Sequence, residues 1–550
     1  MQTAQGNLHL EIQTTRKSPV GILRTSFRDK GKMRHTQHGR ITGCSLEQLK
    51  LLQLAFRERV VPVDDPRAFQ ILNSREYGAS YASLAIAKQL GLQRILYSRT
   101  EPWVSSALAM IVGRLVYAGS KLALCNHHPN TCLWELCGID ESPDVDVHCY
   151  APMDRLLQRQ RAIQTALTRR HLSHGHLVLY DITSVYFEGD YQDSELVAFG
   201  YNRDGKKHRE QVVVGLICNS QGCPVGVEVY AGNTKDDATV VDKVHEIKDC
   251  YGIEKIIFVG DRGMVTRSNI DALKDEADLQ TIGALTHGEM MTLLKNKVIR
   301  LDLFDERNIH EVSDPADPKR RYCLCRNPQT AERESQTRQR LLDLTTTALT
   351  DIAAYQRATT VEKLGARVGK ALAKYKMGKF VQWAIEADPQ QEKSCQHRLT
   401  WSMDAEQVQR EKRFDGCYVI TSDVDKEQMK TLDVVRAYKS LTFVERAFRN
   451  LKTVQLEIRP VYHKTDERIR SHVFLCMLAY YLQWHMEQRL APLFANDGKG
   501  QDRRWTFRGV IDCLVQITRN RVAVNGAEFD QNSIPTPEQE QILKLLQVTM

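Results

Sequence analysis

The sequence predicts an α/β protein, because the spacing of its apolar residues changes twice along the chain. Residues 41–165 place apolar side chains at the intervals of amphipathic helices, and this spacing returns in 428–452 and 466–490. Between these regions, from about residue 173, short apolar runs have the character of strands. A chain of 550 residues exceeds what one hydrophobic core usually organises, so we expect several domains.

The first strand-rich stretch has an informative order of elements. Two strands flank the Ser-Gln-Gly turn at 220–222, which predicts a hairpin. Helices are predicted at 237–251 and at about 267–277. Three antiparallel strands followed by a β-α-β unit is the order of an RNase H-like core. The predicted strands are HLVLYDITSVYF (176–187), QVVVGLICN (211–219), PVGVEVYAG (224–232), KIIFVGD (255–261) and QTIGAL (280–285).

The strand pattern stops near residue 290 and resumes near 413, where FDGCYVITSD predicts another strand. We therefore expect an insertion domain that interrupts the core at 291–412, with helices at 341–355 and 361–380. One face of the second helix is basic and another is apolar, which fits a solvated surface and a DNA-following surface equally well. The basic residues are Lys363, Arg367, Lys370 and Lys374, and the apolar ones are Leu364, Val368 and Ala371.

Charge and hydropathy narrow the class of protein. Eight Lys and Arg residues in 16–40 face a single acid, Asp29, which indicates a solvated flexible arm or one that contacts phosphates. No apolar run approaches the roughly 18 residues that span a bilayer, and the N-terminus has no apolar core of a secretory signal. We therefore expect a cytoplasmic protein without membrane segments.

The 14 cysteines are scattered, and in a cytoplasmic protein most are expected to be reduced, buried thiols. One group, Cys125, Cys132 and Cys137 with His127 and His128, has residue types that bind zinc. It lacks the C-x2-C pair and the second pair of ligands that zinc knuckles use. The sequence therefore favours structural thiols over a zinc site there.

Three acidic residues are candidates for metal-dependent phosphodiester chemistry. Asp181 follows the apolar run LVLY, Asp261 follows IIFVG, and Glu445 lies in YKSLTFVERAFRNLK (438–452). Carboxylates at the ends of buried strands are costly unless paired or coordinated, and Mg²⁺ prefers such oxygen ligands. Two ions about 3.5–4 Å apart activate the attacking oxygen and stabilise the departing one. Taken singly, either aspartate is equally well explained as a turn-former.

The segment around Glu445 adds cations to this carboxylate. In a continuous helix, Tyr438, Leu441, Glu445, Arg449 and Lys452 share one face, and Val444, Phe448 and Leu451 form the core face. The helix then offers a metal ligand with phosphate-binding cations one or two turns away. The alternative is an exposed Glu–Arg pair four residues apart, which adds only a few tenths of a kcal/mol.

At these residues the chain resembles the DDE transposases of bacterial insertion sequences, in the insertion sequence four group with the signature Y-x2-R-x3-E-x6-K. The signature positions here are Tyr438, Leu441, Glu445 and Lys452, so leucine replaces the arginine. The resemblance covers about 170–290 and 413–485, and 100–125 more loosely. Its further motifs are YDITSVYFEG (180–189), GYNRDGK (200–206), AGNTKD (231–236) and VGDRGM (259–264).

The resemblance implies cleavage of transposon ends followed by strand transfer into target DNA. Asp181, Asp261 and Glu445 would be the catalytic residues and the ligands of two Mg²⁺ (or Mn²⁺) ions. Tyr438 and Lys452 would hold the terminal phosphates, and we add Arg446 and Arg449 from their helical position and charge. The implied partners are double-stranded DNA, as terminal inverted repeats and as target, and a second copy of the chain in a synaptic homodimer.

Two other functions fit the same residues. A stand-alone RNase H-like nuclease would cleave without joining, and a catalytically decayed DNA-binding regulator would bind without cleaving. The basic N-terminal region and the insertion weigh against the nuclease, and the presence of all three acids weighs against decay.

The expected organisation follows from these motifs. It comprises a flexible basic arm, a helical DNA-binding region, an RNase H-like core in two parts around an insertion domain, and a C-terminal region that can dimerise. A transposase of this kind is expected in the cytoplasm, associated with the nucleoid. The arm is expected at 1–40, the helical region at 41–165, the core at 166–290 and 413–495, the insertion at 291–412 and the C-terminal region at 496–550.

Overall fold

In a computed structural model, the chain forms two compact units. The first comprises Met1–Ala79, Pro129–Cys132 and Asp512–Glu540, and the second comprises Ser80–His128, Leu133–Ile511 and Gln541–Met550. The structure describes all residues except 1–6, 15–17, 30–31, 59–68, 173–175, 190, 192, 202–207, 236–238, 246–255, 263, 265–268, 270–278, 306–307, 355–358, 388–396, 455, 457, 459–460, 462, 496, 498–502 and 525–526.

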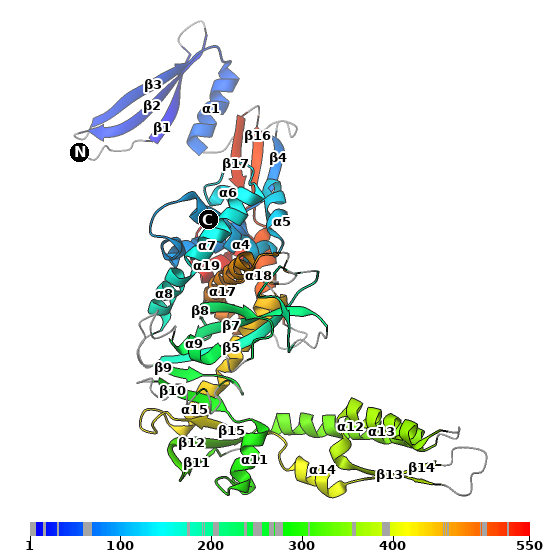
Figure 1. Cartoon of the computed structure of the whole chain (residues 1–550). Coiled ribbons are helices and arrows are strands. Elements are labelled where there is room, and N and C mark those ends of the chain that lie inside the picture. The colour runs from blue at the N-terminus through cyan, green and yellow to red at the C-terminus, as the bar shows by residue number, and fades with distance from the viewer. Residues whose placement is uncertain are drawn as a thin grey trace. The chain divides into compact units, whose positions relative to one another are not determined.

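The first unit contains two small antiparallel sheets (Figure 1). In one, a helix packs on the first strand, and Leu10, Ile22 and Leu49 are buried between them. The other joins a strand near the N-terminus to two near the C-terminus. The first sheet consists of β1 (Asn7–Gln13), β2 (Val20–Asp29) and β3 (Lys32–Ile41) with α1 (Leu46–Glu58), and the second of β4 (Phe69–Glu76), β16 (Thr518–Val524) and β17 (Ala527–Asn532).

The expected flexible arm at 1–40 is therefore wrong for its described part, which forms strands. β2 pairs with β1 and β3 along most of its length, so backbone hydrogen bonds order a segment whose side chains are mostly polar. Nearly every residue of β3 is exposed, which hides the alternating pattern that usually marks a strand. Arg16, Lys17 and Lys30 of the basic run lie outside the described residues.

The helices of the second unit gather around one long helix, α17 (Asp466–Ala495), whose side chains are mostly buried from Ile469 to Met486. It packs against α4 (Pro102–Tyr117), α7 (Ala151–Gln158) and strand β8 (Figure 1). The other helices here are α2 (Gly78–Gln89), α3 (Leu92–Leu96), α5 (Lys121–Asn126), α6 (Leu133–Leu136), α8 (Gln160–His171), α18 (Phe507–Val515) and α19 (Pro537–Leu546).

A nine-stranded mixed sheet forms the centre of the second unit. Its order is β11-β12-β15-β10-β9-β5-β7-β6, with β8 also paired to β7. The pairs β5–β9 and β9–β10 are parallel, and the others are antiparallel. Its strands are β5 (His176–Tyr186), β6 (Ala198–Phe199), β7 (Glu210–Asn219), β8 (Pro224–Ala231), β9 (Ile256–Val259), β10 (Leu279–Ala284), β11 (His310–Asp314), β12 (Asp317–Arg326) and β15 (Cys417–Ser422).

The antiparallel pairing of β7 and β8 confirms the predicted hairpin, and β5, β9 and β10 overlap the other three predicted strands, whereas β6 was not predicted. Gly222 in the connecting turn has φ of +82°, a conformation that favours glycine. The described part of the helix expected at 237–251 forms α9 (Val240–His245), and 237–238 and 246–251 lie outside the described residues. Most of the helix expected at 267–277 lies outside the described residues.

The insertion begins later in the chain than the sequence predicts. Part of the stretch assigned to it forms α11 (His287–Lys295) and then β11 and β12, which widen the central sheet. The chain leaves the sheet after Arg326 and returns at Cys417, and these two residues are paired in neighbouring strands. The predicted range 291–412 therefore contains sheet strands as well as most of the segment that leaves the sheet, residues 327–416, which we call the excursion.

The excursion between β12 and β15 has a small core of its own, and Arg338 forms a bidentate ion pair with Asp415 at its base. On α13, Leu364 and Val368 are buried while the basic residues of the opposite face are exposed, as the sequence predicts. The elements are α12 (Pro328–Ala353), α13 (Val361–Tyr375), β13 (Val381–Ala387), β14 (His397–Met403) and α14 (Ala405–Lys412). Among the described helices none is both long enough and apolar enough to cross a membrane.

Candidate active site

Asp181 lies in β5, and Asp261 lies two residues beyond the end of the neighbouring parallel strand β9. Leu179 of β5 is paired with Val259 of β9, and each aspartate comes two residues later. Extending this register puts Asp181 opposite Asp261, at the roughly 4.8 Å spacing of adjacent strands. Asp181 is partly buried, and the Ile182 N–H donates to its Oδ1 at 2.8 Å. Asp261 is exposed, just beyond the end of β9.

Tyr438 links a distant helix to the second aspartate. It lies on α15 (Thr431–Lys439), which packs against β10 and β15, and its hydroxyl donates to Asp261 Oδ1 at 3.1 Å. Burial raises the pKa of Tyr438 well above its ordinary value, the Asp261 carboxylate raises it further, and Arg262 opposes both. The tyrosine therefore keeps its proton and acts as a hydrogen-bond donor to the carboxylate.

Glu445 lies on α16 (Leu441–Arg449), an amphipathic helix that packs against β5 and β7. Its buried face follows the 3–4 residue spacing of a helix, through Leu441, Val444, Ala447 and Phe448. Glu445 itself is exposed. The helix that carries the third acid thus lies directly on the strand that carries Asp181.

The three carboxylates do not form a close cluster in the described part of the chain. Among the described residues, the only three His, Cys, Asp or Glu side chains whose ligand atoms all lie within 4.8 Å of one another are elsewhere, so the acids do not form so close a cluster. Ligands of two different ions about 3.5–4 Å apart lie up to roughly 8 Å from each other. An all-oxygen set is the type that Mg²⁺ and Mn²⁺ prefer.

Residues 174–482, more than half of the chain, match the family of the transposase DDE domain. The chain belongs to this family. The match extends from β5 into α17 and contains all three acids. The large mixed sheet is consistent with the RNase H-like architecture of this domain. A comparison with curated proteins finds no match.

Membership in the transposase DDE domain family defines the chemistry broadly. It implies a DNA strand-transfer enzyme, and therefore DNA binding. Transposases of this family generally use divalent metal ions. The donor set of Asp181, Asp261 and Glu445 is compatible with such ions.

The signature residues of this transposase domain do not share one continuous helical face, which corrects the prediction from sequence. α15 ends at Lys439, the Ser440 hydroxyl donates to Arg436 O at 3.0 Å, and α16 begins at Leu441. A wider π-helical turn then follows at Asn450–Val454. A serine bonded back to the preceding turn and a π turn both change the direction of a helix, so residues beyond them rotate out of register.

The predicted DNA-binding side chains accordingly differ in exposure. Arg446 and Arg449 are exposed on α16. Lys452, in the π turn, is buried with 9% exposure, and Leu441, at the arginine position of the signature, is also buried. Leu441 is therefore part of the apolar face that holds α16 on the sheet, which gives the departure from the signature a packing role.

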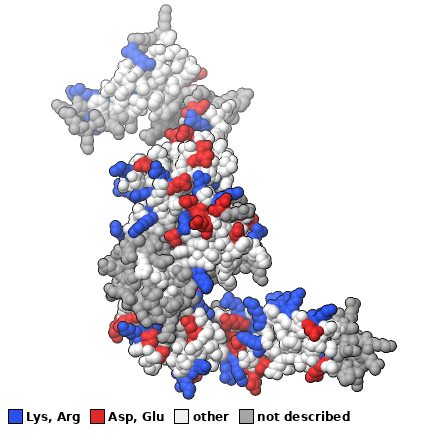
Figure 2. Space-filling model, viewed as in Figure 1, with Lys and Arg blue, Asp and Glu red and all other residues white. Residues whose placement is uncertain are grey.

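A second basic surface lies on the excursion. Lys363, Arg367, Lys370 and Lys374 are exposed along α13, and Lys and Arg side chains gather over α12 and α13 in Figure 2. The two tryptophans of this segment are paired across the β13–β14 hairpin. Trp401 packs on the small core, whereas Trp383 is 42% exposed.

The sequence singles out the three acids, but it does not indicate which side chains surround Asp261. The contact between Tyr438 and Asp261 joins residues 177 positions apart, and nothing in the local pattern indicates it. The spacing of the signature was the available signal for Tyr438. Arg262, directly after Asp261, opposes the rise in the pKa of Tyr438 and was not singled out.

Proposed function

We propose that this protein is a transposase of the insertion sequence four group that cleaves insertion-sequence ends and joins them to target DNA. Asp181, Asp261 and Glu445 are its proposed catalytic residues and metal ligands. One arrangement carries the proposal: Leu179 of β5 pairs with Val259 of β9 two residues before Asp181 and Asp261, and the Tyr438 hydroxyl donates to Asp261.

Each residue has a distinct proposed part in the chemistry. Two bound Mg²⁺ or Mn²⁺ ions supply activation of the attacking oxygen and stabilisation of the departing one. The three carboxylates hold these ions, and Tyr438 fixes the orientation of Asp261 by donating to one of its oxygens. Arg446 and Arg449, both exposed beside Glu445, bind phosphates of the transposon end.

Assignment to the insertion sequence four group rests on the spacing of Tyr438, Glu445 and Lys452. Because Lys452 is buried, its proposed contact with a terminal phosphate requires the phosphate to reach the π turn or the lysine to change rotamer. Arg446 and Arg449 need no such movement, so we assign them the larger share of phosphate binding.

The proposed partners are the terminal inverted repeats, the target DNA and a second copy of the chain in the synaptic complex. The exposed basic face of α13 supports a role for the excursion in DNA contact. A protein with these partners works on chromosomal DNA, in the cytoplasm and with the nucleoid.

The test is an end-cleavage and strand-transfer assay on linear DNA that carries the inverted repeats flanking the gene. Asp181→Asn, Asp261→Asn and Glu445→Gln should each lower cleavage by at least about 100-fold, the effect of removing a group that stabilises developing charge. Glu406→Gln is a matched control, because Glu406 is an exposed helical glutamate paired with Arg410 four residues later, as Glu445 precedes Arg449.

Other outcomes separate the competing functions. Cleavage without joining and without a complex that holds two ends would indicate a stand-alone nuclease. Binding of the repeats without any Mg²⁺- or Mn²⁺-dependent nicking would indicate a decayed regulator. Full activity in any one of the three acid variants would remove that residue from the proposed site.

A further inference from the structure

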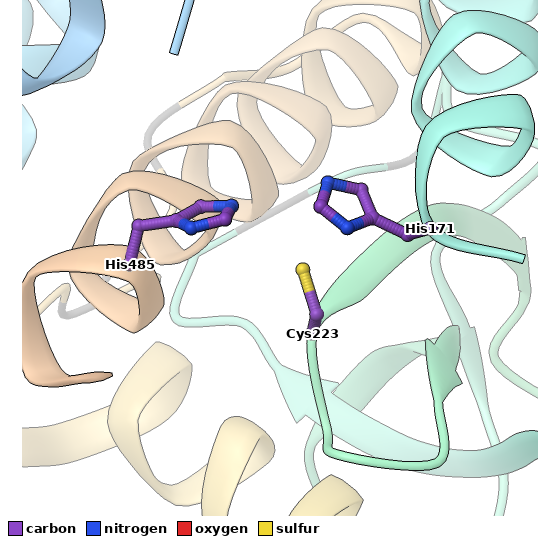
Figure 3. A group of neighbouring side chains, drawn as sticks. All are labelled: His171, Cys223 and His485. Carbon is purple, nitrogen blue, oxygen red and sulfur yellow. The ribbon is translucent and has the colours of Figure 1, made fainter. Parts of the chain in front are cut away.

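Three side chains capable of binding a soft metal meet away from the acidic site. His171 ends α8, Cys223 follows the turn between β7 and β8, and His485 lies in α17. Their ligand atoms all lie within 4.8 Å of one another. Figure 3 shows the two imidazole rings and the thiol directed into a common space from three separate elements.

The hydrogen bonding of this cluster leaves room for a ligand. His485 Nε2 is buried and has no hydrogen-bond partner in the described part of the chain. A buried nitrogen without a partner costs roughly 1–3 kcal/mol, so such atoms are rare without a functional or unobserved ligand. Cys223 is fully buried, and its thiol has only a weak contact with the Pro224 carbonyl at 4.0 Å.

His171 is held by a neighbour, as metal-binding histidines are. Its Nε2 is 2.9 Å from the Tyr481 hydroxyl, which leaves Nδ1 for coordination. Histidine ligands commonly bond their second ring nitrogen to a protein group that fixes the tautomer and the ring orientation. Tyr481 lies one helical turn before His485, so a single helix supplies both a ligand and the support of another ligand.

The protonation states favour coordination by nitrogen. Burial lowers the pKa of His171 to about 4, and Arg170 lowers it further. Burial also lowers the pKa of His485 to about 3, with contributions from His171, Arg170 and Arg489. Both rings are therefore neutral near pH 7. The pKa of Cys223 is raised by burial, so its thiol is protonated until a metal displaces the proton.

We propose that His171, Cys223 and His485 form a binding site for Zn²⁺ or a similar borderline-soft divalent cation, separate from the hard-cation site of the carboxylates. Imidazole nitrogen and thiolate sulfur are both ligands that Zn²⁺ takes from proteins, and three such ligands leave the fourth tetrahedral position open to a water molecule. On binding, the bond from Cys223 Sγ to the metal forms and the thiol proton leaves to solvent. The thiolate offsets one of the two added charges near Arg170 and Arg489.

The site would fasten the elements behind the catalytic helix. The Trp484 Nε1–H donates to the Gln221 carbonyl at 3.3 Å, so the turn before Cys223 already contacts α17. The same turn also packs closely against α16, the helix of Glu445, because a Cβ added to Gly222 would lie 2.6 Å from Cβ of Phe443. A metal that joins α8, this turn and α17 therefore stabilises the surface on which α16 rests.

The test begins with the purified full-length chain, stripped of metal by a chelator and titrated with Co²⁺. A bound thiolate gives a near-ultraviolet sulfur-to-cobalt charge-transfer band, which cobalt at carboxylates does not give. We expect the band to saturate at one Co²⁺ per chain, to disappear on addition of Zn²⁺, and to be absent in Cys223→Ser. No band in the unmodified protein, or an unchanged band in Cys223→Ser, would overturn the proposal.

Matched variants separate loss of a ligand from loss of the fold. Cys218→Ser places a serine hydroxyl at an equally buried position on β7, as Cys223→Ser does beside the histidines. Because Cys218 is not one of the three ligands, this variant should keep the band. Asp181→Asn should also keep it, because its carboxylate belongs to the other site. Tyr481→Phe should weaken zinc affinity about 10- to 100-fold without removing the band, as loss of a supporting hydrogen bond does. Equal zinc affinity in Tyr481→Phe would show that Tyr481 has no positioning role.

Discussion

The acidic site and the His171–Cys223–His485 cluster lie in the same compact unit but are built in opposite ways. Asp181 lies within β5, Asp261 lies just beyond the end of β9 and Glu445 lies on an exposed helix surface, and their donors are hard oxygens. The cluster is mostly buried, and its donors are nitrogen and sulfur. The difference in exposure and donor type matches the two proposals, in which the acids hold hard cations for strand cleavage and the cluster holds a softer cation that stabilises the fold.

The largest expected effect separates the two sites directly. Asp181→Asn should lower strand cleavage by about 10²–10³-fold, or roughly 2.7–4 kcal/mol in activation free energy, while the zinc content of the protein stays unchanged. The measurements are single-turnover cleavage with Mg²⁺ and metal analysis of the same preparation. A variant that lost zinc together with activity would show that the two sites are not independent.

A smaller effect is expected where the two regions touch. Gly222→Ala adds a Cβ at φ of +82°, against Phe443, and should destabilise the domain by about 2 kcal/mol. Urea unfolding measures this loss. Gly138→Ala is a matched control, because Gly138 has a similar φ of +81° but no atom within 4 Å of an added Cβ, so its cost should be the backbone term alone.

A third effect concerns orientation within the acidic site. Tyr438→Phe removes the hydrogen bond to Asp261 and should lower the cleavage rate about 10-fold, corresponding to roughly 1.4 kcal/mol, with little change in stability. Single-turnover rates at saturating DNA measure it. Tyr201→Phe is a suitable control, since Tyr201 is an exposed tyrosine outside the signature. An unchanged rate would show that Asp261 needs no orientation by Tyr438.

The smallest expected effect is the response of the metal-free cluster to acid. The folded pKa values of His171 (about 4) and His485 (about 3) lie below the ordinary value of about 6.5, so the unfolded chain binds more protons below that pH. The contribution of these two histidines to the free energy of unfolding is therefore fully present above about pH 6.5, and it is lost as the pH falls towards 4 and 3. Thermal unfolding of the metal-free His171→Asn/His485→Asn variant should depend less on pH over this window than that of the unmodified chain.

How far the sequence predicts this molecule depends on whether a feature is local. The strand patterns locate β5, β7, β8 and β9, and with them Asp181 and Asp261, because a strand's own side chains record its burial. The apolar face of α13 is likewise evident from spacing. These features need no knowledge of the rest of the fold.

The features that sequence misses depend on contacts between distant segments. Backbone pairing with β2 orders β3, which is almost wholly exposed, and only β1 has an alternating apolar pattern, at Leu8, Leu10 and Ile12. The break at Ser440 depends on a hydroxyl bonded to the preceding turn. Among the thiols, the sequence pattern singled out Cys125 as a possible metal ligand. In the structure its Sγ lies 3.7 Å from that of Cys149, and Cys125 is not part of the cluster with His171 and His485. Cys223 has no spacing relation to His171 or His485, so only the fold brings them together.

The place where the chain leaves and re-enters the central sheet has a further consequence. Asn327 N–H donates to the Gly416 carbonyl at 2.9 Å, directly after the paired residues Arg326 and Cys417. The excursion is thus attached at a single point, like a large loop on a hairpin. Its length and fold can change without shifting the register of β12 and β15, so the basic surface on α13 can vary while the central sheet stays the same.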